Sequence, residues 1–188
     1  MTPWQISVLQ LLGFFTAARL IEVGTSAMRT REARMTRGAE VVAERWWPLM
    51  VGLHTFVLVG SFAGALARGS EPPPRLLLWP ALVLLAVATA IRAWLLFTLR
   101  ADWNVRVIDP GRIVTHGPYR FIRHPNYLAV ILEVAALPVV AGAYEVAVIG
   151  TLVNAWLLSR RIPLEEALLQ RHPRYRDVMM RRHRFLPW

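Results

Sequence analysis

The sequence predicts an all-α integral membrane protein, a helical bundle of about five transmembrane helices followed by a cytoplasmic C-terminal helix. Three observations indicate this fold. The 188-residue chain is 55% hydrophobic. Its apolar residues gather in runs of about 20, the length of helix that spans a hydrocarbon core. The net charge of +10 falls between these runs, so we expect the basic residues to face anionic lipid and not nucleic acid.

The first three transmembrane helices are predicted from three long apolar runs. These runs cover residues 4–23, 46–67 and 76–99, and each is long enough to cross the membrane. Charged residues within them are few. We expect Arg19 and Glu22 to form an ion pair at the membrane interface.

The last apolar stretch, residues 128–158, predicts a helical hairpin. Its middle, residues 141–145, reads AGAYE, which is typical of a turn. Each arm holds roughly 14 apolar residues, or about 21 Å of helix, which is short for a full span. One long bent helix is the alternative. We expect the small residues Ala135, Ala136 and Gly142 to leave a gap between helices through which a lipid could enter.

Polar residues inside these segments have mainly structural interpretations. We expect Arg92 and Glu133 each to be paired inside the bundle, because ions in lipid need partners. Asn154 is expected to join its helix to a neighbour by a hydrogen bond. His54 stands alone on an apolar helix and is expected to be structural.

The tail beyond residue 161 predicts one more helix. Pro163 suits a first helical turn, and Glu165 and Glu166 lie near the positive end of the helix dipole. Leucines at 164, 168 and 169 recur at helical spacing. We expect a helix that starts at Pro163 and lies along the cytoplasmic face, with a simple amphipathic anchor as the alternative.

The distribution of arginine predicts the orientation. Segments 29–45 and 100–123 carry five arginines each, and segment 160–184 carries eight. The 68–75 loop carries two arginines beside a glutamate, and the 141–145 turn carries none. With five helices, all three basic segments lie on one side. The positive-inside rule then places the N-terminus outside and the C-terminus in the cytoplasm.

Residues 117–127, GPYRFIRHPNY, predict a shaped polar site where the fourth helix begins. Gly117-Pro118 and His124-Pro125 indicate two turns, and proline also suits a helix start. Arginines that extend to the headgroups would explain Arg123 but would not explain a histidine between prolines and tyrosines. The sequence therefore predicts a functional site at this position.

Two motifs carry a resemblance to a known family. Residues 117–127 resemble the signature of the isoprenylcysteine carboxyl methyltransferase family, and residues 161–166, RIPLEE, match its Arg-x-x-x-Glu-Glu pattern. Segments 19–22, 46–51 and 103–108 are similar to a bacterial branch, some of whose members methylate long-chain alkylpyrones and related polyketide lipids. The resemblance covers nearly the whole chain and is strongest over residues 92–188.

The resemblance implies a membrane methyltransferase that uses S-adenosylmethionine. One domain would place transmembrane helices in residues 1–91 and a catalytic, cofactor-binding half in residues 92–188, in a bacterial inner membrane. The acceptor would be a lipophilic small molecule or a lipidated protein. The implied cofactor-binding residues are Gly117, Pro118, Tyr119, Arg123, His124, Pro125, Tyr127, Glu165 and Glu166. The implied catalytic residues are Arg161 and Glu165. Of these, Arg161 is expected to hold the acceptor anion.

The chemistry of these residues suits that donor. Arginine or histidine can bind its carboxylate, while glutamates and tyrosine faces can stabilise its ammonium and sulfonium. An acceptor that is already ionised requires no general base, and none is obvious. The chain lacks the Gly-rich strand-turn-helix of the soluble dinucleotide-binding fold, and its histidine spacing predicts no metal.

Two other functions remain open from the sequence. The RHPNY element is similar to one in membrane sterol reductases, which would predict an NADPH-dependent reductase. A small transporter or scaffold would instead predict an ion pathway through the membrane, whereas the polar groups here gather at one cytoplasmic site.

Overall fold

The computed structural model describes residues 1–69 and 71–187 and confirms the all-α fold. The helices are α1 (Pro3–Arg37), α2 (Trp47–Ala67), α3 (Arg75–Leu99), η1 (Arg100–Asp102), η2 (Gly117–Arg120), α4 (Pro125–Val140), α5 (Tyr144–Leu169) and the π-helical turn η3 (Tyr175–Met179). In this part of the chain the β structure is one isolated antiparallel bridge, between Val41 and Ile108.

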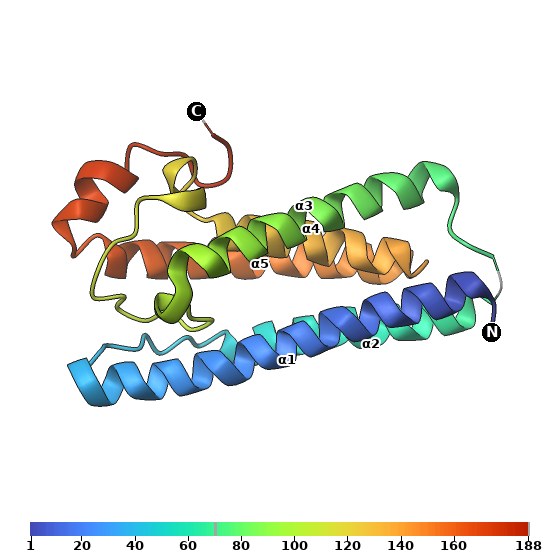
Figure 1. Ribbon diagram of the computed structural model, residues 1–188, viewed down its shortest axis with the longest axis horizontal. Helices are drawn as coiled ribbons and strands as arrows, with labels where there is room; N and C mark the ends of the chain where they lie inside the picture. Colours follow the sequence, from blue (N-terminus) through green and yellow to red (C-terminus); the bar gives the residue numbers. More distant parts are fainter. Residues whose placement is uncertain (70, 188) are drawn as a thin grey trace.

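The helices run roughly parallel to the long axis of the molecule (Figure 1). In that view α1 and α2 lie together along one side, and α3, α4 and α5 form the other side. Helix α4 packs against α2, α3 and α5. The N-terminus, the end of α2, the start of α3 and the α4–α5 turn share one end. The end of α1, both 3-10 turns and the C-terminal segment share the opposite end, which we call the basic end.

The bundle has the dimensions of a membrane protein. Helices α1, α2 and α3 are each long and apolar enough to cross a membrane, and α4 is a shorter apolar helix. The expected hairpin is confirmed, because α4 and α5 are joined by a tight turn at residues 141–143. Gly142 adopts φ +76° in that turn, a conformation that favours glycine.

The small residues of the hairpin do not leave the gap that we expected. Ala136 is 1% exposed in a core cluster. A side chain at Gly142 would meet Arg68, and a side chain at Gly64 of α2 would meet Ala143. Small residues at these positions allow close packing between helices, which closes the space that they would otherwise leave.

Helix α1 extends beyond the predicted run, and segment 29–37 is helical instead of a loop. Residues 25–37 contain neither proline nor glycine to stop it. Gly38 then ends the helix with φ +60°, and its backbone N–H donates to the Arg34 carbonyl. This is a common helix terminus, and the added turns of α1 carry four arginines beyond the predicted apolar run.

The expected helix start at Pro163 is also wrong, because α5 continues through this residue to Leu169. Proline removes one backbone bond, to the carbonyl of Ser159. Both residues lie on the exposed face of α5, where water can satisfy that carbonyl. Buried Ile162 and Glu166 hold the helix on either side. The separate helical element after α5 is therefore limited to η3.

The charged residues inside the bundle form one network. Arg92 lies 3.2 Å from Glu133, which confirms that both are paired. Arg19 pairs with Glu22 at 2.6 Å, but it also lies 3.5 Å from Glu133, so this pair is part of the same network and not a separate interfacial pair. Asn126 accepts a hydrogen bond of 2.9 Å from Arg92.

Candidate functional site

Three residues of the 117–127 motif shape its backbone. Gly117 has φ +61° and lies against Thr98, so a side chain there would collide with α3. Pro118 is buried in the first turn of η2, and Pro125 begins α4. A proline suits both positions, because the first turn of a helix leaves its N–H groups without partners.

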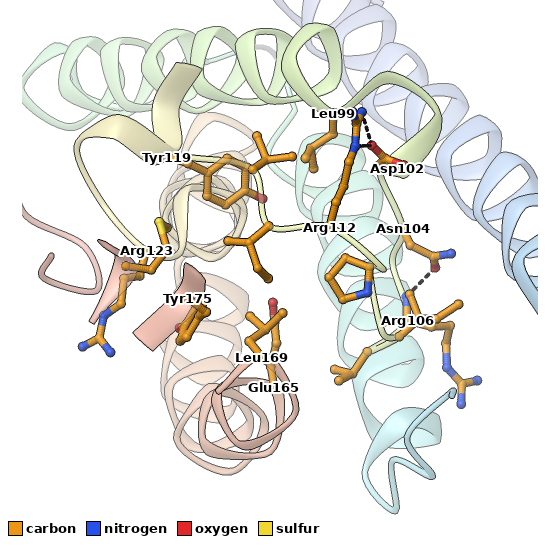
Figure 2. Close-up of a pocket in the computed structure, with 16 residues that line it drawn as sticks. Leu99, Asp102, Asn104, Arg106, Arg112, Tyr119, Arg123, Glu165, Leu169 and Tyr175 are labelled. Carbon is orange, nitrogen blue, oxygen red and sulfur yellow. Dashed lines mark hydrogen bonds and ion pairs between the residues drawn. The ribbon is translucent and has the colours of Figure 1, made fainter. Parts of the chain in front are cut away.

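A polar cavity of about 120 Å³ lies at the basic end. Its walls come from the end of α3, the 102–114 loop, η2, α5 and η3. Figure 2 shows Tyr119 and the Glu165 carboxylate pointing into this space, while the guanidinium groups of Arg106 and Arg123 point away from it. We call it the polar cavity.

A smaller cavity of about 60 Å³ continues from the polar cavity toward the bundle. Both are lined by Asn104, Tyr119 and Glu165, and this inner cavity adds Tyr127 and Arg161. The Tyr127 hydroxyl donates a hydrogen bond to Glu165. The motif at the start of α4 and the motif in α5 therefore meet at one place.

Arg161 is already bound within the protein. Its side chain lies 3.1 Å from Glu44 and donates hydrogen bonds to the Val105 carbonyl and to the Met50 sulfur. Its guanidinium also lies over the ring of Tyr127, 5.6 Å from the centroid. Arg161 thus fixes the 103–107 segment against α2 and α5, an arrangement that the sequence did not predict.

Glu166 holds the C-terminal segment and does not line either cavity. It accepts hydrogen bonds from His124 at 3.0 Å and Arg184 at 2.7 Å, and it lies 3.1 Å from Arg123. Burial alone would raise the pKa of Glu166, but these partners outweigh it and lower the pKa to about 2. We call these four residues the tail clamp.

The backbone strengthens the tail clamp. The N–H groups of Arg123 and His124 donate to the carbonyls of His183 and Arg184 at 2.9 and 3.1 Å. The Arg182 guanidinium also donates to the Tyr119 carbonyl. The C-terminal segment is thereby fastened over the 117–124 turn.

Two tyrosines with raised pKa values line the polar cavity. Burial raises the pKa of Tyr119. Burial and the charge of Glu166 raise the pKa of Tyr175 to about 12. The Tyr175 hydroxyl itself is fully buried, near Glu166 and Arg123 of the tail clamp, so the ring of Tyr175 and not its oxygen forms the cavity wall.

A third, mostly apolar cavity of about 270 Å³ lies between α1, α2, α4 and α5. We call it the membrane cavity. Its rim includes exposed apolar residues of two helices, Leu20 and Val23 of α1 and Val51 of α2, which are 68, 52 and 48% exposed. It meets the inner cavity at five shared residues: Trp103, Val105, Asn126, Tyr127 and Arg161.

The loop between the cavities is anchored to α1 and to the 38–46 segment. The Ser26 hydroxyl lies 2.6 Å from Asn104 and accepts the Val105 N–H at 2.9 Å. Glu44 accepts the Val107 N–H at 3.0 Å. These polar contacts hold an irregular segment as a wall.

The structure divides the predicted site residues into groups. Tyr119, Tyr127, Glu165 and Arg161 line cavities, whereas Gly117, Pro118 and Pro125 shape the backbone, and Arg123, His124 and Glu166 form the tail clamp. Arg123 and His124 also contribute to the inner cavity.

Several lining residues were missed from the sequence. They are Asp102, Asn104, Arg112 and Tyr175 in the polar cavity, and Glu44, Trp47, Met50 and His54 in or beside the membrane cavity. The polar, irregular 100–116 segment was the available signal for the first group. In the part of the chain that the structure describes, no group of three or more potential metal ligands is present.

Comparisons with known proteins agree with this geometry. The model of the isoprenylcysteine carboxyl methyltransferase (ICMT) family matches residues 81–171, which include both motifs. An uncharacterised protein of Bacillus subtilis, YpbQ, is 30% identical over 164 residues, which are 86% of this chain and 96% of that protein.

A solved structure shows the same fold. The eukaryotic intramembrane Ras methyltransferase ICMT superposes with a TM-score of 0.63, covering 95% of this chain and 67% of that one at 16% identity. This likeness shows the shared fold. The family match and the Bacillus relative establish that this chain belongs to the isoprenylcysteine carboxyl methyltransferase family of membrane methyltransferases.

Proposed function

We propose that the chain transfers a methyl group from S-adenosylmethionine to the oxygen of a lipophilic acceptor, a carboxylate or an acidic hydroxyl. The observation that carries this proposal is the meeting of two different cavities. The polar cavity at the basic end continues into the inner cavity, and the inner cavity shares a boundary with the apolar membrane cavity at Tyr127 and Arg161. A charged donor and a lipid acceptor would need such an arrangement.

The polar and inner cavities suit the donor. When bound, S-adenosylmethionine supplies a methyl group on a sulfonium. The Glu165 carboxylate faces the cavities and can bind positive charge, and the ring of Tyr175 lines the polar cavity beside it. Each cavity is smaller than a typical ligand pocket of about 300 Å³. We therefore propose that Tyr175 and Met179 move outward when the donor binds.

The membrane cavity suits the acceptor. Its exposed rim between α1 and α2 faces the position of the lipid. A long chain drawn fully into water would lose about 0.8 kcal/mol per methylene. We propose that the acceptor enters sideways from the bilayer, with only its reactive head reaching Tyr127. Catalysis then depends mainly on positioning the two reacting atoms.

The orientation follows the arginines. We propose that the basic end faces the cytoplasm of a bacterial cell, across its inner membrane, because anionic lipid and the positive-inside rule favour that side. Reporter fusions after residues 35 and 112 and at the C-terminus should report the cytoplasm, and a fusion after residue 72 should report the outside. An outside signal at 112 would overturn this topology.

The methyl transfer can be tested with purified protein in lipid nanodiscs. Radiolabelled S-adenosylmethionine and a total bacterial lipid extract should give a labelled lipid, whose mass identifies the acceptor. Calorimetry measures donor binding separately. Absence of both donor binding and lipid labelling would refute the proposal. Family membership favours methyl transfer over the alternative functions, an NADPH-dependent reductase or a small transporter. A lipid product that forms only with NADPH would favour the reductase instead.

A further inference from the structure

The arginines around the membrane cavity are all neutralised by glutamates. Arg19 pairs with Glu22 at 2.6 Å, Arg92 with Glu133 at 3.2 Å, and Arg161 with Glu44 at 3.1 Å. An anion held in an apolar site needs a cation of its own. Each arginine that lines the described part of this cavity already has a glutamate partner, and Glu44 is shared with Arg106 at 3.4 Å. The described part of the cavity therefore holds no unpaired arginine for an acceptor that arrives as a carboxylate.

His54 contributes a free hydrogen-bond acceptor to the same cavity. Its Nδ1 lies 2.9 Å from the Met50 carbonyl of its own helix. A carbonyl can only accept, so Nδ1 carries the proton and Nε2 presents a lone pair. None of the described residues hydrogen-bonds to Nε2, which leaves this atom to a ligand.

Asn154 is a second unpartnered group in this cavity. It is only 2% exposed, it lines the membrane cavity, and its amide makes no side-chain hydrogen bond to any described residue. The expected bond from Asn154 to a neighbouring helix is therefore not formed. Buried amides normally have partners, and a ligand that donates to His54 and accepts from Asn154 would supply one.

We propose that His54 and Asn154 bind the acceptor as an un-ionised enol or phenol, and that His54 accepts its proton during methyl transfer. This inference rests on the function proposed above and narrows its acceptor to a hydroxyl. An acidic hydroxyl is ionised in water, but an apolar cavity favours its neutral form. A neutral imidazole beside it is then the general base.

The transfer is balanced in atoms and charge. The O–H bond breaks with its electron pair left on oxygen, and the proton goes to Nε2 of His54. That oxygen bonds to the methyl carbon while the carbon–sulfur bond of the donor breaks and its pair stays on sulfur. The positive charge passes from sulfonium to imidazolium, which then loses its proton to water through the inner and polar cavities.

The protonation state of the bound acceptor can be tested without the donor. The probe is 4-nitrophenol bearing a dodecyl chain, whose neutral and ionised forms have separate absorbance bands. At a pH at which empty nanodiscs hold the probe mostly as phenolate, nanodiscs with wild-type protein should hold at least threefold more of it as neutral phenol, donating to Nε2 of His54. His54→Asn keeps a group that can donate to the Met50 carbonyl but lacks Nε2, so it should return the phenolate fraction to the level of empty nanodiscs.

The variants include a control on the same helix. Ser61 is buried in α2 outside the cavity and bonds to the Val57 carbonyl, so Ser61→Ala should leave the phenolate fraction unchanged. His54→Gln is a second variant in case His54→Asn does not fold. Equal phenolate fractions in wild type and a folded His54 variant, or no binding of the probe to wild type, would overturn the inference.

Two readouts of turnover complete the test. In wild type, kcat should fall as His54 protonates at low pH, and in His54→Asn it should drop at least 100-fold at neutral pH and recover toward alkaline pH. The other charged residues around His54 are the same in wild type and His54→Asn, so a difference between their pH profiles reports His54. These residues are Arg19, Glu22, Arg92, Glu133 and Arg161.

The labelled lipid also distinguishes the acceptor classes. Mild alkali releases methanol from a methyl ester but leaves an enol or phenol ether intact. Label that remains in the lipid supports a hydroxyl acceptor. Label released as methanol refutes this inference while the proposed methyl transfer stands, whereas a wild type that neither binds the donor nor labels lipid refutes both.

Discussion

The walls of the polar cavity come mainly from loops and short turns, whereas the walls of the membrane cavity come mainly from the helices of the bundle. In the first, backbone shape is set by Gly117 and the prolines, and the C-terminal segment closes the site through the tail clamp. In the second, the charged groups are fixed by pairing across helices. The difference suggests that the polar cavity can adapt to a ligand while the membrane cavity is rigid.

This comparison assigns different substrates to the two cavities, so variants should separate donor binding from acceptor binding. The largest expected effect is that of Glu165→Gln. It removes the carboxylate that faces the polar and inner cavities, and a hydrogen bond to a charged group contributes about 1.5–3 kcal/mol. Donor affinity measured by calorimetry should fall roughly 10- to 150-fold.

The matched control for that variant is Glu145→Gln, an exposed glutamate in the first turn of α5, at the far end of the bundle. It should bind the donor as wild type does, and Glu165→Gln should still bind an apolar probe. If the donor affinity of both variants equals that of wild type, Glu165 does not belong to the donor site.

Arg161→Lys should affect both substrates, because Arg161 lies on the boundary between the inner cavity and the membrane cavity. A lysine keeps the charge but loses the planar fork that reaches both Glu44 and the Val105 carbonyl. We expect kcat to fall roughly tenfold, with faster hydrogen exchange in residues 103–107 because their anchor is weaker. An unchanged kcat would remove Arg161 from the reaction.

The helices and the motif-bearing ends were predictable from the sequence for physical reasons. Long apolar runs predict membrane helices because a chain in lipid must satisfy its backbone hydrogen bonds internally. Gly117 and Pro125 predict turns because each favours a particular backbone conformation. The continuation of α5 through Pro163 could not be predicted, because it depends on tertiary contacts of Ile162 and Glu166.

The membrane cavity could not be predicted for a similar reason. His54, Met50 and Glu44 lie more than 100 residues before Arg161, and an apolar helix does not reveal which of its faces borders a cavity. Because the sequence does not show that His54 borders a cavity, we expected His54 to be structural and found no obvious general base.

A smaller effect is expected from closing the rim between α1 and α2. Val51→Trp places a large ring at the rim of the membrane cavity. It should raise the KM of a long-chain acceptor severalfold and leave donor affinity unchanged. In wild type, each added methylene should lower KM by up to about fourfold, the equivalent of 0.8 kcal/mol, until the cavity is filled.

Leu66→Trp is the control for the rim variant, since Leu66 is exposed on the same helix outside the cavity. It should leave KM unchanged. Equal KM values for a short, water-soluble head group and its long-chain form would contradict entry from the bilayer, whatever the rim variant does.

The smallest effect at neutral pH concerns the tail clamp, which distinguishes the adaptable cavity from the rigid one. The pKa of Glu166 falls from its ordinary 4.5 to about 2 because its partners stabilise the carboxylate. A lowered folded-state pKa stabilises the clamp above pH 4.5 and loses that contribution as the pH falls toward 2. Hydrogen exchange and limited proteolysis of residues 175–187 should therefore increase over this window, before the membrane helices respond.

Glu166→Gln should show the same release of the C-terminal segment already at neutral pH, because a neutral amide cannot form an ion pair with Arg184. Protection of this segment that stays constant from pH 6 to 2.5 would show that the backbone bonds of Arg123 and His124 hold the tail by themselves.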